Sequence, residues 1–180
     1  NGGVHTDDLR ARSYQTLETL LPTAEKLGMI IAVENGFEPS NAPEEVVGCI
    51  RHFNSPYIAC CLDIGHAHIM DSEAPRAADT IVEKIREKAW NNKITLRPFA
   101  ETVKLLAPWI VTCHTHDNDA TADQHLFPGD GNIDWPRTMA ELRQCPRLES
   151  IQNETNFCAR GTSIARGCRV FRDLAAMIHP

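Results

Sequence analysis

Four short strand-like runs alternate along this chain with segments of helical periodicity, and an acidic residue or a histidine follows every run. Such alternation is typical of an α/β fold in which helical crossovers join parallel strands. The predicted strands cover Met29–Val33, Tyr57–Leu62, Trp109–Cys113 and Glu149–Asn153. The predicted helices cover about 7–27, 43–52, 76–90, 98–106, 136–143 and 163–177. The segment 71–97 is expected to be a solvated helical insertion, with a cover over the site or a dimer contact as alternatives.

The residues that follow the four runs are Glu34, Asp63, His114 and Glu154. In a (β/α)₈ barrel, functional side chains gather at the C-terminal ends of the strands, so these four residues are expected to converge on one site. Any one of them alone could be a helix cap or a solvated charge. Together, three carboxylates and one imidazole suit a divalent metal ion, with Mn²⁺ expected first and Mg²⁺, Co²⁺ or Zn²⁺ as alternatives.

The predicted fold class is α/β of the (β/α) TIM-barrel type, with only the C-terminal half, about four βα units, present in this chain. Residues 1–180 are then a single barrel domain that lacks its N-terminal strands. The chain opens at Asn1 without a start methionine, in a loop before a helix, as a chain missing its first half would. Because open strand edges invite pairing, we expect a homo-oligomer or another partner to cover them.

Supporting groups lie close to the strand ends. His66 comes three residues after Asp63, on a predicted loop, where it could contact metal or substrate or merely bond to backbone. His116 shares a face with His114 if the strand continues, and we favour His114 as the ligand because it is nearer to the apolar run. Asp117 could orient the ligand histidine through a hydrogen bond, without binding the metal itself.

A loop with two glycines and a proline follows at residues 123–135. Asp123 and His125 are two positions apart in it and could ligate a metal jointly. As a bare pattern, however, this segment is also what a plain surface loop looks like, because glycine and proline are the usual residues of turns.

Composition narrows the classes of partner and compartment. The chain has 18 basic and 24 acidic residues and a net charge of -6, without a basic cluster, which argues against nucleic acid. No apolar run approaches the roughly 18 to 20 residues of a membrane span, and no signal segment is visible. The seven cysteines include no CxxC pair, so reduced buried thiols and a cytoplasmic location are expected.

Five motifs together resemble the xylose-isomerase-like TIM-barrel superfamily, which includes sugar phosphate isomerases and epimerases and endonuclease IV. They are ENG at 34–36, LDIGH at 62–66, HTHD at 114–117, DQHLFPGDGNIDW at 123–135 and the acidic strand end at 154. The resemblance implies that residues like Glu34, Asp63, His114 and Glu154 bind one divalent ion, and that the two glutamates also move protons.

The same resemblance implies further roles. Residues like His66 and Asn35 would contact the substrate. In the endonuclease members, positions like Asp123 and His125 bind a further metal, together with two histidines from earlier strands. A second metal, or support for the first, is therefore implied for His66, Asp123, His125, His116 and Asp117.

The leading prediction is a divalent-metal-dependent isomerase or epimerase of a sugar, sugar phosphate or polyol, acting by proton transfer through a metal-stabilised enediolate. Glu34 and Glu154 would serve as base and acid on opposite faces of a small carbohydrate substrate. One alternative is an endonuclease IV-like phosphodiesterase acting on abasic DNA. Another is an incomplete barrel fragment without catalytic activity.

Overall fold

A four-stranded parallel sheet forms the centre of the chain, with strand order β1-β2-β3-β4. The computed structural model describes residues 6–75, 77–90, 93–157 and 161–178, so the expected opening loop at 1–3 lies outside the described part. The strands are β1 (Ile31–Glu34), β2 (Ile58–Asp63), β3 (Ile110–Thr115) and β4 (Ser150–Asn153). The predicted parallel α/β arrangement is confirmed.

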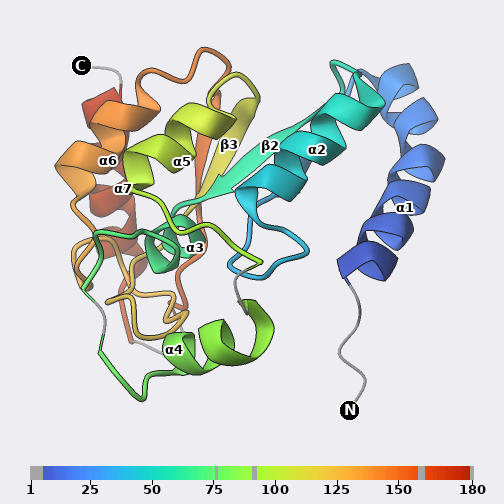
Figure 1. Cartoon of the computed structure of the whole chain (residues 1–180). Coiled ribbons are helices and arrows are strands. Elements are labelled where there is room, and N and C mark those ends of the chain that lie inside the picture. The colour runs from blue at the N-terminus through green and yellow to red at the C-terminus, as the bar shows by residue number, and fades with distance from the viewer. Residues whose placement is uncertain (1–5, 76, 91–92, 158–160, 179–180) are drawn as a thin grey trace.

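Helices cover one face of this sheet (Figure 1). They are α1 (Thr6–Leu27), α2 (Pro43–Phe53), α5 (Phe99–Leu106), α6 (Trp135–Leu142) and α7 (Ile164–Ile178). Helices α2, α5, α6 and α7 contact one another in that order. Helix α1 lies outside α2, at the β1 end of the sheet (Figure 1). The start of α2 follows from sequence chemistry, because Pro43 occupies its first turn, where the missing N–H costs nothing.

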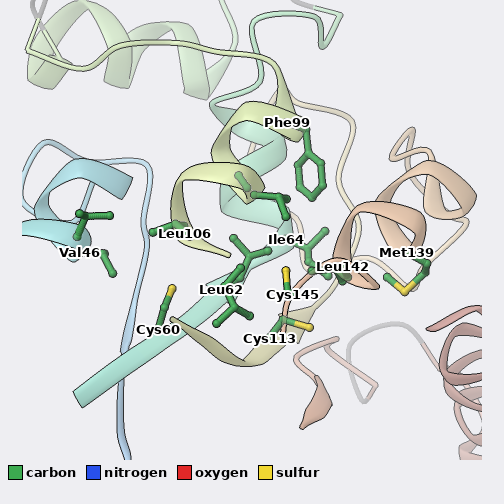
Figure 2. Close-up of a cluster of buried hydrophobic side chains, with 14 of the residues drawn as sticks. Val46, Cys60, Leu62, Ile64, Phe99, Leu106, Cys113, Met139, Leu142 and Cys145 are labelled. Atoms are coloured by element: carbon green, nitrogen blue, oxygen red, sulfur yellow. The ribbon is translucent and has the colours of Figure 1, made fainter. Parts of the chain in front are cut away.

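The main core lies between the sheet and these helices (Figure 2). Ile58, Cys60 and Leu62 of β2 are fully buried and meet Leu106 of α5 on this side. Burial of one such aliphatic side chain contributes about 1.5–3 kcal/mol. Because side chains alternate across a strand, the intervening residues of β2, with Asp63 last among them, face the other side of the sheet.

The segments after β2 depart from the sequence prediction in two places. His66 was expected on a loop, but it lies in a short helix, α3 (Ile64–Ile69). The side chain of Asp63 caps this helix by accepting a hydrogen bond from the His66 backbone N–H at 2.6 Å. The helix predicted from Arg76, which lies outside the described residues, is α4 (Ile81–Ile85) followed by the π-helix η1 (Arg86–Trp90).

The insertion that carries α4 is not a freely solvated helix. Val82 and Trp90 are buried, and with Ile69 and Met70 of the α3 region they form a second apolar cluster. Thr80 caps α4 through the N–H of Glu83. Only the outer face of this segment is exposed to solvent, because its apolar inner face packs onto the α3 region.

Strands β1 and β4 are the two edges of the sheet in the described part of the chain. Most of the exposed large apolar side chains lie beside these edges: Leu20, Leu27, Met29 and Ile30 near β1, and Ile164 and Met177 on α7. This arrangement is that of a partial barrel. Among the described residues, no helix is both long enough and apolar enough to cross a membrane.

Candidate metal centre

Four side chains from four strands meet at the C-terminal edge of the sheet. Glu34 and Asp63 end β1 and β2, His114 lies near the end of β3, and Glu154 directly follows β4. One ligand atom from each lies within 4.8 Å of the others. We call Glu34, Asp63, His114 and Glu154 the first group. The structure therefore brings the four predicted residues together at the strand ends.

The first group has the chemistry of a cation site. His114 Nδ1 lies 3.3 Å from Glu154 Oε2, 3.4 Å from Glu34 Oε2 and 3.9 Å from Asp63 Oδ2. His114 Nδ1 and Glu154 Oε2 are buried and make no hydrogen bond within the described structure. Buried polar atoms without partners are uncommon in folded proteins. A divalent cation would satisfy these atoms and offset the repulsion among three carboxylates, so the donor set fits such an ion.

The carboxylates of the first group differ in acidity. Burial by itself raises the pKa of Asp63, but its hydrogen bond with His116 and the nearby charge of His66 lower that pKa to about 2. Burial and the neighbouring carboxylates of Asp63 and Glu34 raise the pKa of Glu154. Asp63 is therefore ionised at neutral pH, and Glu154 is the carboxylate that holds a proton more readily.

Asn35 has a role different from the predicted substrate contact. Its side chain is fully buried, donates to the backbone oxygen of Asp63 at 3.2 Å and accepts from the Asp63 N–H at 2.9 Å. Both ends of the amide are used in this pair of bonds. Asn35 therefore fixes the end of β2 against β1 and positions Asp63, instead of facing a ligand.

A second cluster lies directly beside the first group. His66, His116, Asp123 and His125 place one ligand atom each within 4.8 Å of one another, and we call them the second group. Asp123 Oδ2 lies 3.2 Å from His125 Nε2 and 3.4 Å from His66 Nε2. The rings of His116 and His125 stack, with centroids 4.0 Å apart. His114 and His116 thus both face this edge of the sheet, but they belong to different groups.

Electrostatics in the second group favours the charged forms of His66, His116 and Asp123. Burial by itself lowers the pKa of His66, but its hydrogen bond with Asp123 and the charge of Asp63 raise that pKa to about 9. The pKa of His116 is also raised, because its hydrogen bond with Asp63 outweighs the effect of burial. Gly65 makes room for this packing, since a Cβ there would overlap the His116 ring.

Asp117 does not orient a histidine in the way that was predicted. Its buried carboxylate accepts hydrogen bonds from the Gly129 N–H and from the Trp135 indole N–H, both at 2.8 Å. Asp117 is therefore bound to the loop that follows it in sequence. The aspartate of the HTHD motif and the glycines of the PGDG motif are partners across this loop.

Phe37 is a residue at the site that the sequence prediction missed. Its ring meets the His66 ring edge-on, with centroids 5.1 Å apart, and it packs against the second apolar cluster with Val82 and Trp90. Phe37 therefore connects the insertion to the second group as an apolar wall. The signal was its position directly after ENG, three residues beyond Glu34.

Comparison with known proteins relates the chain to a family, to a curated protein and to a solved structure. The family described as xylose isomerase-like TIM barrel matches residues 1–154. An uncharacterized protein of Methanocaldococcus jannaschii is 23% identical over 144 residues, which are 78% of this chain and 41% of that protein. The crystal structure of a D-tagatose 3-epimerase-like protein superimposes with a TM-score of 0.67 at 20% identity, over 96% of this chain and 56% of its own.

The two relatives are both much longer than this chain, which spans about two fifths of the first and somewhat more than half of the second. At 20% identity, the likeness to the solved structure concerns the fold. The likeness in fold is a property of the backbone. The two groups of side chains are a separate observation about ligand atoms.

Proposed function

Because the chain belongs to the xylose isomerase-like TIM barrel family, we propose that it is a divalent-metal-dependent isomerase or epimerase of a sugar, sugar phosphate or related polyol. The observation that carries this proposal is the first group, in which three carboxylates and a single imidazole converge at the strand ends. The D-tagatose 3-epimerase-like fold neighbour supports the same reaction class. Mn²⁺ is our first choice of ion, because oxygen-rich sites with one imidazole suit it.

The positions of the two glutamates in the first group support a role in proton transfer. Glu34 comes from β1 and Glu154 from the end of β4, so they approach from opposite ends of the sheet. Their side chains are 36% and 37% exposed, whereas that of Asp63 is fully buried. A substrate can therefore touch both glutamates, with one removing a proton from carbon and the other, itself protonated, delivering its own proton to the opposite face.

Two further features support the proposed proton transfer. When bound, a divalent ion supplies a Lewis acid that holds adjacent substrate oxygens and stabilises negative charge. The side chain of His66 is 16% exposed, and its Nδ1 lies 3.1 Å from the backbone oxygen of Asn35 and 3.4 Å from Glu34 Oε1, so a protonated His66 stabilises the anionic form of the proposed base. Asp63, anchored by Asn35, remains a fixed anion beneath them.

The proposal is tested by metal content and sugar binding. Elemental analysis of the wild type should find an ion that Glu154→Gln loses, and calorimetry should find ketose binding, with D-tagatose as the first probe, only when Mn²⁺ is present. Glu149→Gln is the matched control, because Glu149 is exposed and lies outside both groups. Metal-independent sugar binding, or equal metal content in wild type and Glu154→Gln, would contradict the proposal.

The second group favours one other function, metal-dependent phosphodiester cleavage at abasic sites in DNA. Three histidines and an aspartate next to the first group offer a further metal position, and clustered metals suit phosphoryl chemistry. The acidic net charge of -6 weighs against a DNA partner. Several ions per chain and cleavage of a synthetic abasic duplex, both lost in Asp123→Asn, would favour this function over the sugar enzyme.

We further propose a cytoplasmic location and a partner at the open edges. Cys60, Cys61 and Cys113 are buried free thiols, which suits a reducing compartment. The exposed apolar residues beside β1 and on α7 are of the kind that interfaces bury. Sedimentation of the chain, with and without candidate partners, measures whether these edges associate.

A further inference from the structure

The segment between β3 and α6 carries Asp123 and His125, and its fold is organised around one buried carboxylate. Strand β3 ends at Thr115, and α6 begins at Trp135. The 19 residues between them contain no regular element, only an isolated bridge between Asp117 and Leu126. A loop of this length needs specific bonds to hold one conformation.

The carboxylate of Asp117 supplies those bonds. Its Oδ1 accepts from the N–H groups of Asn118 and Ile133, at 2.9 and 3.2 Å. Its Oδ2 accepts from the Gly129 N–H and the Trp135 indole N–H, both at 2.8 Å. The side chain is fully buried, so these four donors take the place of water. One carboxylate thus joins the start of the loop to its end.

The backbone of the same residue holds the second group in place. Asp117 and Leu126 exchange two backbone hydrogen bonds of 2.8 Å, and His125 directly precedes Leu126. His125 adopts φ 47, in the left-handed region, and its Nδ1 lies 2.7 Å from the backbone oxygen of Glu154. A non-glycine residue keeps such a φ only when its surroundings determine it.

Neighbouring residues tie the loop to α3. The Asn118 side chain donates to the Gly65 backbone oxygen at 2.9 Å, one residue before His66. A Cβ at Gly131 would overlap Asp117 Oδ1, so the glycine of this loop closes around the carboxylate. The loop is therefore tied to α3 one residue before His66, which helps to hold Asp123 within 3.4 Å of His66.

We propose that Asp117 is a positioning residue for the second group: its carboxylate closes the 117–135 loop and thereby sets where Asp123 and His125 stand relative to His66 and His116. Only the metal-binding consequence of this inference rests on the proposed function, because the placement itself is a property of the metal-free chain. The variant Asp117→Asn keeps the size of the side chain and replaces one acceptor oxygen with a donor, which cannot bond to two N–H groups.

The first readout is hydrogen exchange of the full chain without metal. In Asp117→Asn, exchange should accelerate at least tenfold at the Leu126 amide, which bonds to the Asp117 backbone and not to its side chain. Exchange in β2 and α5 should stay unchanged. Asp130→Asn is the matched control, because Asp130 lies in the same loop and pairs with Arg166 instead. Unchanged exchange at Leu126 in Asp117→Asn would overturn the proposal.

The second readout is titration with Zn²⁺ alone. In Asp117→Asn, the affinity of the ion held by the second group should fall at least tenfold, while the ion of the first group is kept. Leu106→Ala, a core variant on α5, should lose stability without this selective effect. If both ions weaken equally in Asp117→Asn, the role of Asp117 is general stability and the proposal fails. If the wild type holds one ion, the metal function of the second group fails, and the exchange at Leu126 still decides the positioning role.

Discussion

His116 Nε2 lies 3.1 and 3.2 Å from the two carboxylate oxygens of Asp63, so a residue of the second group bonds directly to a residue of the first. Both side chains are fully buried. A change at Asp63 itself therefore affects both groups. The two groups are therefore electrostatically coupled through Asp63 and His116.

Asp63→Asn should weaken Mn²⁺ binding by at least 100-fold. The substitution removes the charge of a first-group ligand and replaces one of the two oxygens beside His116 Nε2 with an amide nitrogen. Weakening of an orienting partner alone typically costs 10- to 100-fold. Calorimetric titration with Mn²⁺ measures the change. Asp173→Asn on the exposed face of α7 is the control. Equal affinities in the two variants would remove Asp63 from the site.

His66 should make the stability of the metal-free protein depend on pH. Because its pKa is raised from 6.5 to about 9, the folded chain binds this proton more tightly than the unfolded chain does. The stabilisation is fully present below about pH 6.5 and is lost as pH rises through about 9. Urea unfolding in the presence of a chelator should show this decrease in the wild type, and His66→Gln should reduce it. A parallel pH dependence in both proteins would assign the effect to other groups.

Phe37→Ala should lower stability and open the apolar wall beside His66. Phe37 is partly buried, so a loss of about 1–3 kcal/mol in the free energy of unfolding is expected, below the usual cost for a fully buried ring. Under the proposed function, KM for the sugar should rise, because an apolar face next to the reacting carbons is lost. Phe37→Leu should restore most of both properties. Denaturant unfolding and steady-state kinetics measure the two effects separately.

Alkylation should distinguish buried from exposed cysteines. Burial raises the pKa of Cys61 to about 12 and that of Cys49 and Cys145 to about 11, and thiolates are the reactive form. Cys168 is exposed. Iodoacetamide at pH 7.5, followed by peptide mass mapping, should modify Cys168 rapidly and these buried thiols only on unfolding. Cys168→Ser is the control, and fast native modification of Cys61 would contradict its described burial.

The first group could be predicted because the sequence shows both where the apolar strands end and that helices join them in parallel. Glu34, Asp63 and His114 end apolar runs, and parallel strands bring their ends to one edge. The helix at Ile64–Ile69 was also signalled, since Asp63 is a helix-capping residue type, but the same aspartate was interpreted only as a ligand. One side chain here both faces the site and caps the next helix.

The roles of Asn35 and Asp117 could not be derived from spacing. Asn35 bonds to a strand that follows 28 positions later, and Asp117 bonds to donors 12 to 18 positions away. Such pairs depend on how the chain folds back, which propensity and periodicity do not specify. The insertion was misjudged for a similar reason: its apolar residues face α3 and Phe37, and their partners are remote in sequence.

The helices that flank the sheet also determine which molecules can complete it. The described part of the chain has four strands but five covering helices, because α1 flanks β1 on one side and α7 follows β4 on the other. If β4 of one copy paired with β1 of another, α7 and α1 would compete for the same place over the seam. Direct pairing of these two edges would therefore require α1 or α7 to move from its place beside the sheet.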